Sequence, residues 1–134
     1  MGGITAAILF FLLGWLGYGV LLKTFFANHT GAAGNLMRSD KDVQFLYLAG
    51  GEVLLGFALA FIFVKANISS LASGLVTGGV IGFLISAGIN CIMYGTSIMV
   101  SKMGMAADTA TITVMWAIAG SVVGAMGGMG KKAG

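Results

Sequence analysis

Residues 71–100 read LASGLVTGGVIGFLISAGINCIMYGTSIMV, and none of these thirty positions carries a charged side chain. A bilayer core about 30 Å thick is crossed by about 20 apolar residues of an α-helix, which rises 1.5 Å per residue. The run therefore predicts a transmembrane helix. Its excess length predicts that this helix is tilted or that one of its ends projects beyond the bilayer.

Three further apolar segments surround this run, at approximately residues 4–26, 44–64 and 109–127. Of the 134 residues, 58% are hydrophobic and only 8% are charged, whereas about a quarter of the residues of soluble domains are charged. Strands of a membrane barrel would alternate in polarity, but residues 4–22 are apolar on every side except at Thr5. We therefore expect an all-α integral membrane protein, a single domain over residues 1–134, with four transmembrane helices in an antiparallel bundle.

One long polar connection, residues 27–43, is expected between the first two helices. An even number of crossings places both ends of the chain on the same side of the membrane. Tyr18-Gly19 and Tyr94-Gly95 occur near the ends of the first and third segments, which leaves open a construction from two tandem two-helix repeats. Lysine and arginine residues are divided almost evenly between the two sides, so the positive-inside rule does not determine the orientation.

Small residues recur at every fourth position in the third and fourth segments, and positions four apart lie on one face of a helix. These stripes consist of Gly74, Gly78, Gly82 and Ser86 in the third segment, and of Gly120, Gly124 and Gly128, which follow Trp116, in the fourth. The spacing predicts two grooved faces that let helix backbones approach closely.

Glu52 is the acidic residue that lies well inside an expected helix. An intramembrane acid is costly and by default marks a functional site that faces the bundle interior or water. Asn90 lies at nearly the same expected depth on an oppositely directed helix, so we expect a hydrogen bond between Glu52 and Asn90. This pair either fixes the helix packing or binds a cation or small solute, and the sequence leaves both interpretations open.

Trp15, Tyr18, Tyr94 and Trp116 are expected to anchor the helices at the membrane interfaces, which is the common role of membrane aromatic residues. The two tryptophans lie rather deep for that role, and the alternative is that they line the wider end of the bundle. Together with the polar pair, these four residues complete the set of candidate binding residues.

The sequence contains no nucleophile elbow, phosphate-binding loop or heme-attachment motif. One acid and one amide do not define an acid–base pair, and His29 has no nearby cysteine or second histidine with which to hold a metal. Cys91 is expected to be a small buried residue. The net charge of +3 comes from residues at the segment ends, which does not form a nucleic-acid patch. We therefore expect no enzyme activity, no cofactor, no metal and no nucleic-acid partner.

The motifs GWLGYG at residues 14–19 and IMYG at residues 92–95, with the glycine-striped last segment, resemble small bacterial four-helix membrane proteins classed as domain of unknown function number 1761. The resemblance covers most of the chain. It implies a four-helix fold and a multi-pass location in the bacterial inner membrane, and it implies no reaction.

Two functions are compatible with these features. The first is a non-enzymatic multi-pass membrane protein that acts by helix-mediated assembly in the lipid bilayer, as a homo-oligomer or as a small subunit of a membrane complex. The second is a small transporter or channel with a polar site at Glu52 and Asn90. Water access separates them, because a sealed Glu52 is structural whereas a Glu52 that opens into a cavity on the side of the long polar connection is a site.

Overall fold

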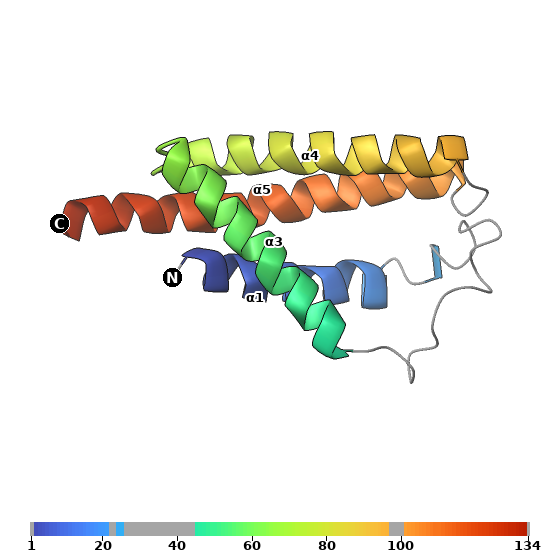
Figure 1. The fold of residues 1–134 in the computed structure, drawn as a ribbon, viewed down its shortest axis with the longest axis horizontal. Coiled ribbons are helices and arrows are strands. Elements are labelled where there is room, and N and C mark those ends of the chain that lie inside the picture. Colours follow the sequence, from blue (N-terminus) through green and yellow to red (C-terminus); the bar gives the residue numbers. More distant parts are fainter. Residues whose placement is uncertain (1, 22–23, 26–44, 97–100, 134) are drawn as a thin grey trace.

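The structure, a computed structural model, describes residues 2–21, 24–25, 45–96 and 101–133. These residues form α1 (Gly2–Gly14), the π-helix η1 (Trp15–Leu21), α3 (Phe45–Lys65), α4 (Leu71–Thr96) and α5 (Lys102–Ala133) (Figure 1). The polar connection expected over residues 27–43 lies outside the described residues, as do residues 97–100 at the end of the third expected segment.

Three helical segments of the described chain are long and apolar enough to cross a membrane: Gly2–Leu21, Leu71–Thr96 and Lys102–Met129. This confirms the expectation of an all-helical chain with helices able to span a bilayer. The fourth helix, α3, is not among these three candidates. The first turn of α1 and the last turn of α5 lie toward the same end of the molecule (Figure 1).

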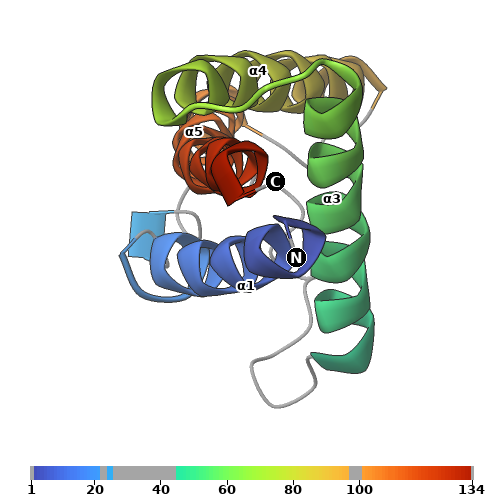
Figure 2. The same cartoon turned by 90° about the vertical axis from the view of Figure 1, so that its left-hand side faces the viewer.

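The expected antiparallel bundle of four helices is corrected at α3. The axes of α1, α4 and α5 are roughly aligned, with α5 between the other two and running opposite to them, whereas α3 crosses them obliquely (Figures 1 and 2). A Cβ atom on Gly56 would lie 2.5 Å from the backbone nitrogen of Ala7 and from the carbonyl oxygen of Gly3. The backbones of α1 and α3 therefore meet at a point made of small residues, which allows a steep crossing.

Helices α4 and α5 pack side by side along the two glycine stripes. A Cβ atom on Gly74 would collide with the carbonyl oxygen of Gly120, and one on Gly78 would collide with that of Trp116. These obstacles are backbone atoms, which cannot rotate away as a side chain can. The two grooved faces are thus in contact with each other inside the chain.

The tight turn between α3 and α4 follows from its sequence. Asn67 has a positive φ of 61°, and the backbone nitrogen of Ile68 donates to the carbonyl oxygen of Phe63 over 2.9 Å. This is the Schellman arrangement, in which a left-handed residue ends a helix and the next residue packs back onto it. Ser70 then caps α4, because its Oγ accepts a hydrogen bond of 3.1 Å from the backbone nitrogen of Ser73.

Helix α5 begins at Lys102, seven residues before the expected start at residue 109. Ser101 provides the cap, since its Oγ accepts a 3.0 Å hydrogen bond from the backbone nitrogen of Gly104. The earlier start places Asp108 inside the helix, whereas the sequence had suggested a position in the connection before it.

The hydrophobic core joins α1, α3 and α5. Its buried members are Ala6, Phe10, Leu59, Phe63, Met115, Trp116, Ala119 and Val123. Trp116 is only 5% exposed, and its ring centroid lies 5.0 Å from that of Phe10. The expectation that Trp116 anchors the protein at a membrane interface is therefore wrong, because α1 covers this side of α5.

Candidate functional site

A group of polar side chains gathers around Asp108, where α4, α5 and η1 meet. The Tyr18 hydroxyl donates to Oδ1 of Asp108 over 2.5 Å. Nδ2 of Asn90 donates to Oδ2 over 2.6 Å, and Oγ of Ser86 lies 3.5 Å from the same oxygen. Both oxygens of one carboxyl group thus receive hydrogen bonds from two other helical segments.

The amide of Asn90 extends this group. Its Nδ2 also lies 3.3 Å from Oγ of Ser86 and 3.1 Å from Oγ1 of Thr109. Asn90 and Ser86 are buried. We call these five residues, Tyr18, Ser86, Asn90, Asp108 and Thr109, the polar cluster.

The glycine stripes explain why Asn90 meets Asp108. Along the antiparallel contact, Gly74 lies against Gly120 and Gly124, and Gly82 lies against Trp116. In steps of four residues, the stripe of α4 continues forward from Gly82 through Ser86 to Asn90. Because the helices are antiparallel, the facing stripe of α5 continues backward from Trp116 through residue 112 to Asp108. The same register that brings the glycines together therefore brings these polar groups together.

Tyr18 reaches the polar cluster from η1, the π-helical continuation of α1. In a π-helix the backbone bonds join residues five apart, and such segments are rare and occur frequently at functional sites. Gly17 lets this segment approach α5, since a Cβ atom there would lie 3.3 Å from Cγ2 of Thr111. The π-helical geometry and the close approach to α5 together place the Tyr18 hydroxyl within hydrogen-bond distance of Asp108.

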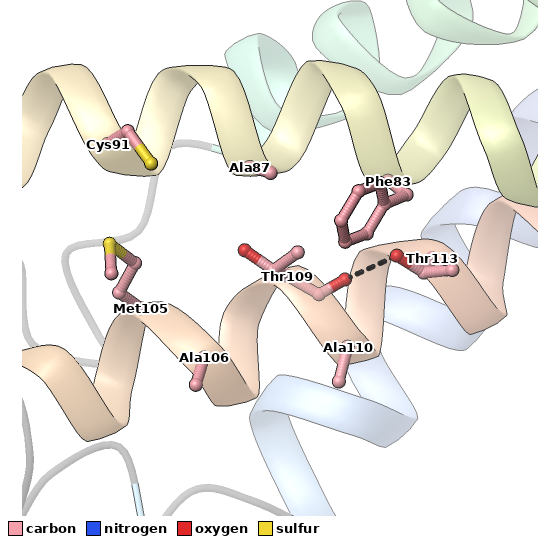
Figure 3. A pocket seen from close by; sticks show the side chains of 8 residues that line it. All are labelled: Phe83, Ala87, Cys91, Met105, Ala106, Thr109, Ala110 and Thr113. Atoms are coloured by element: carbon pink, nitrogen blue, oxygen red, sulfur yellow. Dashed lines mark hydrogen bonds between the residues drawn. The ribbon is translucent and has the colours of Figure 1, made fainter.

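A groove of about 460 Å³ runs along the outer side of the contact between α4 and α5 (Figure 3). It is lined by Phe83, Ala87, Cys91, Met105, Ala106, Thr109, Ala110 and Thr113. Thr109 belongs to both the groove and the polar cluster, so it links the interior hydrogen bonds to the surface of the helix pair. Cys91 is exposed, which corrects the expectation that it is buried.

Glu52 lies apart from the polar cluster. One of its carboxylate oxygens is 3.7 Å from the position that a Cβ atom on Gly14 would take, and the half-buried side chain borders an apolar cavity of about 220 Å³ between α1 and α3. Asn90 instead bonds to groups on α4 and α5. The expected Glu52–Asn90 hydrogen bond is thus not formed, because the oblique α3 packs mainly on α1 whereas α4 packs mainly on α5.

The remaining candidate residues divide into two groups. Tyr18 joins the polar cluster, so it does not serve only as an anchor. Trp15 and Tyr94 are exposed, and interfacial anchoring stays a prediction for both.

Sequence reasoning missed Asp108 and Thr109 as site residues, although the four-residue spacing of the last segment, followed two turns back from Trp116, ends at Asp108.

Comparison of the chain with protein-family models, with curated proteins and with solved structures finds no match. The resemblance to domain of unknown function number 1761 therefore stays a prediction, and the functional argument rests on the geometry of the polar cluster.

Proposed function

We propose that this chain is a non-enzymatic multi-pass membrane protein that works as a small transporter or channel, with the polar cluster as its site. The observation that carries the proposal is the carboxyl group of Asp108, held between helices by Tyr18 and Asn90. An ionisable residue in a membrane-spanning segment is expensive and by default indicates a functional site. Asp108 takes the place that the sequence had suggested for Glu52.

Two features favour a site over a purely structural bond. The groups that contact the carboxyl group in the described part of the chain are neutral, and neutral serine or asparagine pairs join membrane helices without the cost of an acid. The glycine stripes that suggested assembly between chains are also occupied by the contact between α4 and α5.

Ion currents test the proposal. Purified protein is reconstituted in liposomes on a solid-supported membrane, and gradients of H⁺, Na⁺ and K⁺ are imposed one at a time. We expect a current with at least one gradient, and we expect Asp108→Asn to reduce it to the level of empty liposomes. Ser121→Ala, whose hydroxyl bonds only to the α5 backbone at Ile118 in the described chain, is the matched control and should conduct normally. An undiminished current in Asp108→Asn would refute the proposal.

We further propose that α3 also crosses the membrane, which makes four crossings. Its 21 residues span about 32 Å at 1.5 Å each, close to the thickness of a bilayer core. In a Cys91→Ser background, single cysteines at Gly2, Ser69, Ser101 and Ala133 report the side of each position. We expect Gly2, Ser69 and Ala133 on one side and Ser101 on the other. If α3 does not cross, Ser69 will be labelled from the side opposite to Gly2.

Helix-mediated assembly is a second candidate function, favoured by Gly88 on the outer side of α4. Gly88 is exposed, and no atom of the described chain lies within 4 Å of the position of its missing Cβ. Glycine in a helix interior costs about 1 kcal/mol relative to alanine, a cost that no contact within the described chain offsets. A second copy of this chain packed against Gly88 would supply such a contact.

Native mass spectrometry from a mild detergent measures this assembly. We expect a dimer that Gly88→Leu dissociates and that Leu75→Phe, an enlargement at an exposed position on another face of the same helix, leaves intact. A wild-type protein that is entirely monomeric would exclude self-assembly.

A further inference from the structure

We infer that the species bound by the polar cluster is a proton, carried by Asp108 as a carboxylic acid; this inference rests on the function proposed above and names its substrate. It follows from which atoms surround the carboxyl group and from what each of them can donate or accept.

The polar cluster can satisfy Asp108 in both of its protonation states. Hydroxyl groups and the carboxamide of asparagine each contain a donor and an acceptor. An ionised Asp108 accepts hydrogen bonds from Tyr18, Asn90 and Ser86, as the structure shows. A protonated Asp108 donates its own hydrogen to the oxygen of Tyr18 or Ser86 after that hydroxyl rotates. The carboxyl group therefore finds hydrogen-bond partners within the polar cluster in either protonation state.

A metal cation fits the polar cluster poorly. Hard cations take several oxygen ligands, but Nδ2 of Asn90 stands 2.6 Å from Oδ2 of Asp108. This amide nitrogen offers a cation only hydrogens, so a cation at Oδ2 would have to displace it. Within the described residues, no group of three or more histidine, cysteine or acidic side chains is placed to hold a metal.

The titratable groups around the polar cluster leave Asp108 as the group that carries the proton. Tyr18 is the titratable side chain that faces Asp108 from η1, while α4 contributes the neutral Ser86 and Asn90. On α5 itself, Lys102 is exposed and lies six residues away. Glu52 on α3 is near Gly14, one turn before Tyr18. Among the described residues, the carboxyl group has no basic contact that would keep it permanently ionised.

The chemical step is a single proton exchange. A hydronium ion transfers a proton to a carboxylate oxygen of Asp108, so that one O–H bond of the hydronium ion breaks and one forms on Asp108, and one neighbouring hydroxyl changes from donating to accepting. Release breaks the same O–H bond, returns the proton to water and restores the original hydrogen bonds. No other bond forms or breaks, and no oxidant or reductant takes part.

Infrared difference spectroscopy of the protein in lipid vesicles, recorded between high and low pH, tests the inference directly. We expect a carboxylic acid C=O band on acidification. Asp40, Asp42 and Glu52 can contribute to such a band as well, so the difference between the wild-type and Asp108→Asn spectra isolates the component from Asp108. That component should be missing in Asp108→Asn, persist in Asp108→Glu and Glu52→Gln, and change frequency in Tyr18→Phe, because the carboxyl group then loses one hydrogen-bond partner. Far-UV circular dichroism of each variant verifies that the helices are retained.

The results separate this inference from the proposed function. A band that survives in Asp108→Asn and vanishes in Glu52→Gln would overturn the inference and assign the proton to Glu52. A Na⁺ or K⁺ current that depends on Asp108, with no carboxylic acid band, would overturn the inference and leave the transport function standing. An Asp108 band in a protein that passes no current would support proton binding and refute transport.

Discussion

Gly78→Ala should destabilise the packing of α4 on α5, although it adds only one methyl group. The new Cβ would collide with the carbonyl oxygen of Trp116 and would lie 3.1 Å from Cα of Gly120. To avoid this collision the two helices have to move apart, and overpacking of this kind costs about 1–3 kcal/mol. Gly78→Leu should cost about 3 kcal/mol or more, because its side chain is larger. The free energy of unfolding, measured by steric trapping in bicelles, gives the magnitude.

The adjacent glycine is the matched control. A Cβ atom on Gly79 would make an ordinary contact of 3.4 Å with Cβ of Ala117, so Gly79→Ala should not lower the free energy of unfolding and should raise it by up to about 1 kcal/mol, because alanine is favoured over glycine in a helix interior. Val80→Leu, at an exposed position of the same helix, should be tolerated as well. Equal effects at Gly78 and Gly79 would mean that the helices do not meet in this register.

Trp116→Ala should give the largest loss of stability among single truncations in this chain, about 3–5 kcal/mol, the range found for buried large aromatic residues. The Trp116 side chain fills the space between Phe10 on α1 and Gly82 on α4. Removing it leaves a cavity at the junction of three helices, where backbone contacts limit collapse. The same unfolding measurement applies.

Trp15→Ala provides the comparison, because the Trp15 side chain is 62% exposed. Its removal leaves no cavity between helices, so it should lower the free energy of unfolding less than the removal of Trp116 does. A larger loss at Trp15 than at Trp116 would contradict the placement of the two tryptophans.

Several features could be predicted from the sequence because they depend on one segment at a time. Apolar length predicts helices able to span a bilayer, and the interval of four between Gly74, Gly78 and Gly82 predicts a face for close contact, since periodicity is a local property of a helix. The Asn67 turn also depends on neighbouring residues alone. Depth along the helix, by contrast, does not determine which polar residues meet. Glu52 and Asn90 lie at equal expected depth and still do not pair.

The tertiary structure determined which faces actually meet. Glu52 and Asn90 have similar depths as counted along the sequence, but a hydrogen bond needs a shared register and facing directions as well as equal depth. The register of α4 on α5 places Asn90 at Asp108, and the oblique crossing at Gly56 turns Glu52 toward Gly14. Likewise, Trp15 and Trp116 have the same local chemistry, and only the position of α1 buries one of them. Crossing angle and register arise from contacts between segments far apart in the chain, so no periodicity within one segment contains them.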